Sequence, residues 1–161
     1  MSESENEKHK DLCQRSWDYF EIHAAQRLTT FNFYIVLSSV IASALFTILP
    51  NSQASHVSCI LGFLLIFFSF IFWKLDSRNK DLIKGAEAAI KYFERNSDIK
   101  DANEEPHVTK IFLREEFLTS KRRQKKSIFF WKNYLSYSNC FNIIFIVFGS
   151  VGLVGIVLSL L

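Results

Sequence analysis

Uncharged apolar stretches alternate with charged segments along the chain, and this alternation dominates the sequence. No Asp, Glu, Lys or Arg occurs from Leu28 to Trp73 or from Asn133 to Leu161. Three runs in these stretches are long enough to cross a bilayer, because a spanning helix needs roughly 17–25 apolar residues. These runs are 31–49, 57–73 and 141–161. Pro50 and Asn51 are predicted to end the first helix and begin a short turn. The pattern predicts an all-α integral membrane protein with three transmembrane helices.

Helical periodicity extends beyond the first two runs into the charged segments. Apolar residues recur at intervals of four and three, which places each set on one helix face. The set before the first span is Cys13, Trp17, Phe20, Ala24, Leu28 and Phe31; the set after the second is Leu75, Asn79, Leu82, Ala86, Ala89 and Phe93. Heptad-like stripes of this kind need a partner helix. We therefore expect both helices to continue out of the membrane and to pack together as a cytoplasmic helical stalk.

The segment before the third span is predicted to hold a polar linker, a short helix and a basic run. The linker is 96–105, and Pro106 suits the first turn of a helix. The apolar face expected for that helix comprises Val108, Ile111, Phe112, Glu115 and Leu118. The predicted organisation is a cytoplasmic amphipathic helix at 1–30, a transmembrane hairpin at 31–73, a cytoplasmic helical segment at 74–138 and a third transmembrane helix at 139–161.

The distribution of basic residues predicts the orientation. All 19 Lys and Arg residues fall in 1–27 or 74–132, and positive charge accumulates on the cytoplasmic side of membrane proteins. We expect the N-terminus in the cytoplasm and the C-terminus outside, in a multi-pass protein of the bacterial inner membrane. Residues 1–30 lack the features of a cleavable signal peptide, so the first span is expected to direct insertion. The composition excludes an ordinary soluble enzyme, a disordered chain and a typical nucleic-acid-binding domain.

The residues that carry enzymatic or metal chemistry are scattered. Cys13, Cys59 and Cys140 contain no CxxC spacing, and the four His residues show no metal-ligand spacing. No predicted span contains Asp, Glu or His, which disfavours an intramembrane enzyme, and the lack of an internal repeat disfavours a small transporter. We expect a protein that is not an enzyme, with no metal and no cofactor.

The first span carries a polar face. Its members, seven, four and four residues apart, are Asn32, Ser39, Ser43 and Thr47. Polar residues within spans tend to face a bundle interior or water. The face is therefore a candidate pore lining in an oligomer, or alternatively a packing surface of small residues. His23 and Arg27 lie one turn apart at the cytoplasmic mouth of this helix, where they would anchor to headgroups or form a ring of charge.

Two further groups have structural or binding interpretations. Small residues in the third span favour close helix packing, with a flexible gate as the alternative. They are Gly149, Gly152, Gly155 and Ser159. The basic run before that span is expected to contact anionic lipid, or alternatively a nucleic acid or protein partner. It contains Lys121, Arg122, Arg123, Lys125 and Lys126.

The layout of residues 12–95 resembles a known family. Trp17 and the segment HAAQR at 23–27 precede the first span, and the helix LDSRNKDLIKGAEAAIKYFE at 75–94 follows the second. This arrangement is similar to the SLATT-type small membrane effectors of bacterial conflict systems, including retron-associated ones. The resemblance implies an antiphage protein that permeabilises the inner membrane when triggered. The third span departs from the family's minimal two-span plan.

Two functional hypotheses follow. In the first, the chain forms a homo-oligomer that opens a path across the membrane, and its cytoplasmic helices sense a protein, nucleic-acid or nucleotide signal. In the second, it is a non-conducting membrane anchor or assembly subunit that recruits a soluble partner. The two differ in whether the polar face of the first span is needed for conductance.

Overall fold

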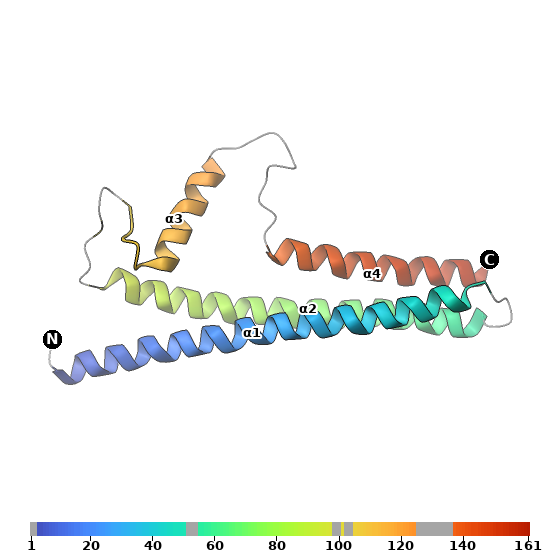
Figure 1. Cartoon of the computed structure of the whole chain (residues 1–161), viewed down its shortest axis with the longest axis horizontal. Helices are drawn as coiled ribbons and strands as arrows, with labels where there is room; N and C mark the ends of the chain where they lie inside the picture. Colours follow the sequence, from blue (N-terminus) through green and yellow to red (C-terminus); the bar gives the residue numbers. More distant parts are fainter. Residues whose placement is uncertain (1–2, 51–54, 98–100, 102–104, 125–136) are drawn as a thin grey trace. The chain divides into compact units, whose positions relative to one another are not determined.

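The computed structural model describes residues 3–50, 55–97, 101, 105–124 and 137–161. Over these residues the chain forms helices α1, α2, α3 and α4 (Figure 1). Their bounds are Glu3–Ile48, Ser55–Arg95, Ile111–Gln124 and Tyr137–Leu160. The described residues contain no strand, so the predicted all-α fold class is confirmed.

Helices α1 and α2 are continuous through both their charged and their apolar parts, with 46 and 41 residues respectively. Neither contains a proline, and α2 has glycine only at Gly62 and Gly85, so little in either sequence interrupts helical hydrogen bonding. The expectation that the flanking helices run directly into the first two spans is therefore confirmed.

Three of the helices, α1, α2 and α4, are long and apolar enough to cross a membrane. Their number agrees with the three predicted spans. Helix α4 begins at Tyr137, four residues before the apolar run 141–161 that predicted the third span.

The chain divides into two compact units. The bundle unit comprises Ala25–Asn79 and Leu135–Leu161. The stalk unit comprises Met1–Ala24 and Lys80–Tyr134. The bundle unit contains the apolar parts of α1, α2 and α4, and the stalk unit contains the polar parts of α1 and α2 together with α3.

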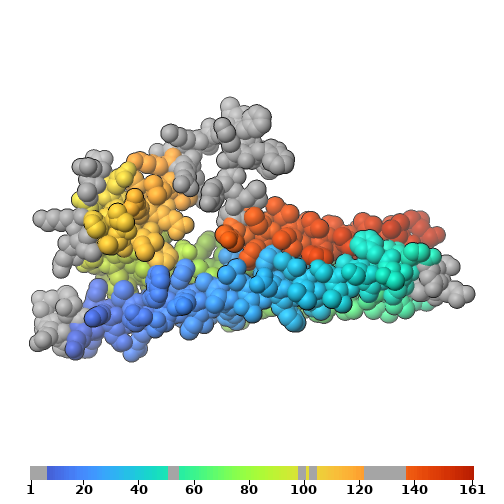
Figure 2. All heavy atoms as spheres, in the orientation of Figure 1, coloured from blue at the N-terminus to red at the C-terminus, as the bar shows by residue number. Residues whose placement is uncertain are grey.

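The core of the bundle unit is a stack of aromatic and aliphatic side chains between α1, α2 and α4. The Phe31 and Phe141 rings stack with centroids 3.6 Å apart. Tyr34 is fully buried, and its hydroxyl lies 2.8 Å from Ser69 Oγ. Because Ser69 donates to the Leu65 carbonyl, Tyr34 is the donor to Ser69. Figure 2 shows α4 packed along the apolar part of α1.

The stalk unit has a smaller aromatic core. Phe112 of α3 is buried and meets the edges of Trp17 and Phe20 of α1, with centroids 5.9 and 5.2 Å away. The rings of His9 and Phe93 make an edge contact 4.8 Å apart between α1 and α2. The predicted packing of these two helices against each other is thus present, and α3 is a third partner that the sequence analysis did not include.

Several predicted faces are corrected by the structure. Leu28 and Leu75 are exposed rather than inward, and Asp76 takes the buried position beside Leu75. Apolar spacing gives no signal for a buried carboxylate with an ionic partner, so the prediction placed Leu75 inward instead of Asp76. Pro106 does not start a helix, because α3 begins only at Ile111.

The predicted face of α3 is also corrected. Phe112 is its only buried member, whereas Val108, Ile111, Glu115 and Leu118 are exposed. A single aromatic side chain fills the space against α1, so the neighbouring apolar positions are left on the surface.

Candidate functional site

The polar face of the first span points away from the bundle unit's core. Asn32, Ser39, Ser43 and Thr47 are all exposed, whereas Ser38 and Ala42 beside them are buried. The stripe is flanked by the exposed apolar side chains of Phe33, Val40 and Phe46. One protomer therefore presents a narrow polar stripe on an otherwise apolar surface.

The hydroxyls of this stripe are partly satisfied within α1. Ser43 donates to the Ser39 carbonyl and Thr47 donates to the Ser43 carbonyl, each over 2.8 Å. Each hydroxyl keeps its acceptor lone pairs free. The Ser43 and Thr47 hydroxyls can therefore face water or a neighbouring helix without leaving an unpaired donor. Its role as a pore lining remains a prediction.

A buried ion pair lies at the start of the apolar part of α1. Arg27 Nε and Nη2 donate to the two oxygens of Asp76 at 2.7 and 3.0 Å, and Nη2 also donates to Ser138 Oγ at 3.1 Å. The guanidinium lies 4.9 Å from the centroid of the Phe141 ring. The side chains of Arg27 and Asp76 are only 13% and 8% exposed. One guanidinium thus ties α1, α2 and α4 together.

The ion pair borders a narrow crevice. Thr30, Phe72, Asn79 and Phe145 line the crevice beside it, which has no room for a water molecule. A bidentate arginine–carboxylate pair has fixed geometry, and such buried pairs specify one arrangement more than they add stability. The predicted ring of charge at a pore mouth remains untested, but in the protomer Arg27 is occupied by an internal partner.

Asp76 and Ser138 were not identified from the sequence. A usable signal existed, since Arg27 is the last charged residue before the first span and Asp76 follows the second span closely. A helical hairpin returns both positions to the same end of the bundle. His23, the other predicted mouth residue, lies in the stalk unit with its Nδ1 buried and without a hydrogen-bond partner among the described residues.

The small residues of α4 lie where that helix approaches α1 and α2. A Cβ added at Gly152 would lie 2.5 Å from the Gly62 carbonyl oxygen, and one at Gly155 would lie 2.5 Å from Leu45 Cδ2. The Ser55 hydroxyl donates to the Ser159 carbonyl. At Gly149 the nearest atom is Ser69 Cβ at 3.7 Å, which is ordinary contact. The placement fits the predicted helix-packing role.

The basic run is only partly described. Lys121 is exposed and forms an ion pair with Glu105 at 2.9 Å, and this salt bridge holds the pKa of the Glu105 carboxyl below its usual range. Arg122 and Arg123 continue α3. Lys125 and Lys126 lie outside the described residues. Contact of this run with lipid or a partner remains a prediction.

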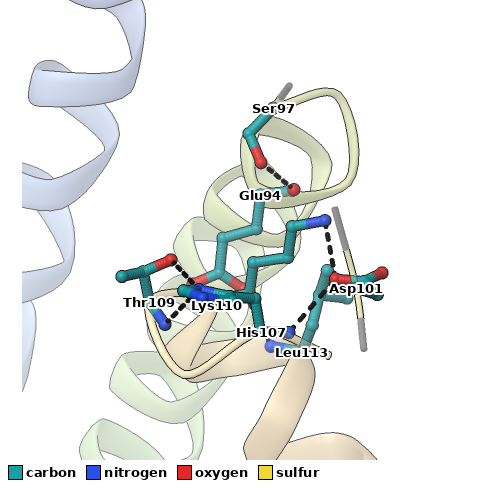
Figure 3. Close-up of polar contacts among 7 residues, drawn as sticks. All are labelled: Glu94, Ser97, Asp101, His107, Thr109, Lys110 and Leu113. Atoms are coloured by element: carbon teal, nitrogen blue, oxygen red, sulfur yellow. Dashed lines mark hydrogen bonds and ion pairs between the residues drawn. The ribbon is translucent and has the colours of Figure 1, made fainter. Parts of the chain in front are cut away.

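A polar cluster attaches α3 to α2 in the stalk unit (Figure 3). The Glu94 carboxylate accepts hydrogen bonds from the backbone N–H groups of Phe112 and Leu113, at 3.1 and 2.8 Å. A carboxylate at this end of a helix satisfies free N–H donors and complements the helix dipole. Glu94 therefore caps α3 from a different helix.

An ion pair between Lys110 and Asp101 holds the loop before α3. Lys110 Nζ lies 2.9 Å from Asp101 Oδ1, and the lysine side chain is only 6% exposed. The His107 backbone N–H also donates to Asp101, at 3.1 Å. These donors hold the pKa of the Asp101 carboxyl below its usual range, with the Lys110 hydrogen bond as the largest cause. Within the described part of the chain, no group of three His, Cys, Asp or Glu side chains could hold a metal.

The chain is similar to known proteins over most of its length. It is 31% identical over 149 residues to CD-NTase-associated protein 19 of Escherichia coli, covering 92% of this chain and 90% of the relative. No solved structure matches the chain. The sequence model of the octameric membrane protein family (8xMP) matches residues 10–161, which include the apolar parts of α1, α2 and α4, so the chain is a multi-pass membrane protein. These matches do not single out the SLATT-type group. The chain belongs to the octameric membrane protein family.

Proposed function

We propose that this protein is a non-enzymatic membrane effector of a bacterial antiphage system. It oligomerises in the inner membrane, with its N-terminus in the cytoplasm and its C-terminus outside. When triggered it permeabilises that membrane, depolarises the cell and stops growth. The SLATT-type resemblance suggests the same kind of effector.

The observation that carries the proposal is the outward-facing polar stripe of α1. Asn32 is exposed in the protomer, and a side-chain amide is costly against lipid unless it finds water or a polar partner. One protomer cannot enclose water around this surface. A family whose members assemble as octamers offers eight such stripes, and eight copies placed around one axis would surround a wet path.

The stripe has the chemistry of a weakly selective lining. It consists of one amide and three hydroxyls, with no charged group among them. Such groups replace part of an ion's hydration shell without binding it tightly, so ions would enter and leave freely. The expected activity is a flux of small ions rather than transport of a chosen substrate.

The relative's name supports the defence context. It is described as associated with a CD-NTase, and a nucleotidyltransferase makes nucleotide products. We infer that the trigger of the present protein comes from a nucleotidyltransferase system, as a nucleotide signal sensed directly or through a partner. Co-expression with such an enzyme should then cause depolarisation that does not occur with a catalytically inactive enzyme.

The lining is tested by expressing the chain from a tight promoter, with its trigger, and following membrane potential with a voltage-sensitive dye. Ser39→Leu/Ser43→Leu should abolish depolarisation while the oligomer still forms in native mass spectrometry. The matched comparison is Ser150→Leu, an exposed serine on α4, which should leave depolarisation intact.

The alternative is a non-conducting anchor that recruits a soluble partner. It predicts that the wild type does not depolarise the membrane under any trigger. It also predicts that Ser39→Leu/Ser43→Leu and Ser150→Leu still recruit the soluble partner. Loss of activity only in Ser150→Leu would instead assign the lining to α4.

A further inference from the structure

Two helix faces of the stalk unit expose large apolar side chains around a central charge. On α1, Leu12 and Tyr19 are 53% and 43% exposed, and Arg15 lies between them. Residues three and four apart are neighbours on a helix surface, so these three side chains share one face. We call Leu12, Arg15 and Tyr19 the α1 stripe.

The second face belongs to α3. Ile111 and Leu118 are 60% and 39% exposed, and the exposed Glu115 lies between them at spacings of four and three. We call Ile111, Glu115 and Leu118 the α3 stripe. The two stripes have the same length and matching apolar ends, and their central charges are opposite.

Lipid does not account for the α1 stripe. Leu12 precedes Leu28, where the charge-free stretch begins, by 16 residues of continuous helix, or about 24 Å at 1.5 Å per residue. Aligned apolar side chains in water are a feature of protein contact surfaces, whereas single exposed ones are ordinary. The stripe therefore calls for a protein partner.

The two stripes are separate surfaces of the stalk unit. Helix α3 packs on α1 through Phe112, which contacts Trp17 and Phe20. Trp17 and Phe20 lie on a different face of α1 from Tyr19 and Arg15, because each residue advances 100° around the helix. The packing of α3 on α1 therefore leaves the α1 stripe exposed. The α3 stripe is exposed as well, so both can contact other copies of the chain.

A ring of identical subunits requires such a pair of surfaces. Each subunit in a ring offers one surface to the neighbour ahead and a different, complementary surface to the neighbour behind. We propose that the α3 stripe of one copy packs against the α1 stripe of the next copy in the oligomer, with Glu115 paired to Arg15. The proposal rests on the family's octameric assembly and is independent of permeabilisation.

The internal partner of Arg15 does not oppose this pairing. Arg15 contacts Asp11 at 2.9 Å, but their side chains are 72% and 58% exposed. Exposed pairs one helical turn apart contribute little. The guanidinium has further donors that can reach Glu115 of a neighbour.

Disulfide cross-linking tests the contact in the full chain in membranes. Cys13, Cys59 and Cys140 are first replaced by Ala, and retention of the oligomer is verified by native mass spectrometry. Tyr19→Cys/Ile111→Cys should then give, on oxidation, a ladder of covalent species that extends to the octamer. Either single variant should give none, because in an antiparallel packing that aligns Arg15 with Glu115, position 19 meets position 111 and not itself.

The matched control for cross-linking is Tyr92→Cys/Ile111→Cys, which uses an exposed aromatic position on α2 and should give no ladder. Dimers from either single variant would overturn the proposal in favour of a two-fold contact. Absence of cross-links in the Tyr19/Ile111 pair would overturn it directly.

Charge reversal provides a second test with the native cysteines in place. Arg15→Glu or Glu115→Arg alone should raise the concentration at which the detergent-solubilised oligomer half-dissociates by about tenfold, since like charges would meet at each interface. The double variant Arg15→Glu/Glu115→Arg should return this half-dissociation concentration to within about threefold of the wild-type value. Asp81→Arg, at an exposed acid on α2, is the control reversal and should have no effect. Failure of the double variant to recover would overturn the pairing.

Discussion

The bundle unit and the stalk unit of this protein are held together by different interactions. In the bundle unit, glycines bring helix backbones together, as where Gly62 faces Gly152, and one buried ion pair joins three helices. In the stalk unit, Phe112 fills a small aromatic core, and α3 and the loop before it are positioned by two ion pairs whose carboxylates are about half exposed, Lys91–Glu116 and Lys110–Asp101. The difference follows from the solvent. Because the hydrophobic effect does not favour association of apolar helices in lipid, close packing and buried polar contacts must stabilise the bundle unit.

Different consequences of mutation follow for the two units. In the bundle unit, the contacts at Gly152 and Arg27 cannot readily adjust, because their neighbours are a backbone oxygen and a buried carboxylate. The hydrogen bonds from Glu94 to α3 in the stalk unit are only partly buried, so water replaces a lost one at smaller cost. We therefore expect substitutions in the bundle unit to have the larger effects.

The largest effect is expected for Arg27→Ala. The change leaves the Asp76 carboxylate buried without its partner, which typically costs about 3–5 kcal/mol. Chemical unfolding in detergent micelles measures it. Arg27→Leu/Asp76→Leu should recover most of the loss, because no unpaired charge remains; equal instability of the single and double variants would contradict this account.

A glycine series in α4 should give the next largest effect. Gly152→Ala places a methyl group 2.5 Å from a backbone oxygen and 2.9 Å from Leu65 Cβ, so the helices must separate. Such overpacking costs about 1–3 kcal/mol. Gly149→Ala, with ordinary contact at 3.7 Å, is the control and should be neutral or slightly stabilising in the same unfolding experiment. Similar losses in both variants would argue against close packing as the cause.

In the stalk unit, Glu94→Ala should loosen α3 without unfolding the rest. The variant removes acceptors for two backbone N–H groups, a loss of cap that costs about 1 kcal/mol. Hydrogen exchange should quicken by several-fold in the first turn of α3 and stay unchanged in α4. Asp81→Ala serves as the control. Exchange that quickens equally in both helices would contradict a local role.

The smallest effect is expected from pH. The Asp101 carboxyl has a lowered pKa because Lys110 and the His107 N–H stabilise its charged form. Its contribution is therefore complete above the ordinary aspartate pKa of about 3.9 and is lost as pH falls through the lowered value. Exchange at Lys110 and Ile111 should quicken on acidification below about pH 4, and Asp101→Asn should lessen this dependence. An unchanged pH profile in the variant would exclude Asp101 as its source.

The helical fold was predictable because its signals are local. Charge-free runs of sufficient length indicate spans, and unbroken periodicity from Cys13 to Phe31 indicates a helix that continues into the first one. The polar positions from Asn32 to Thr47 were found in the same way, as residues at helical spacing. Their common exposure in the protomer could not be read from spacing, which gives a face but not its direction.

The remaining features needed residues far apart in the sequence. The Arg27–Asp76–Ser138 contact joins three helices, and Glu94 caps a helix that begins at Ile111. The pattern around Leu75 suggested an apolar contact because burial of a charge leaves no periodic signal. Phe112, Trp17 and Phe20 were each recognised as members of an apolar face, but the spacing did not show that Phe112 contacts the other two.

The sequence by itself determined how many times the chain can cross a membrane and where its long helices run, because helix formation and hydrophobic length depend on neighbouring residues. The tertiary structure decided which side of each helix is buried, which charges are paired and which apolar stripes remain uncovered. Those outcomes depend on the rotation of each helix against its partners, and that rotation is set by contacts between distant residues.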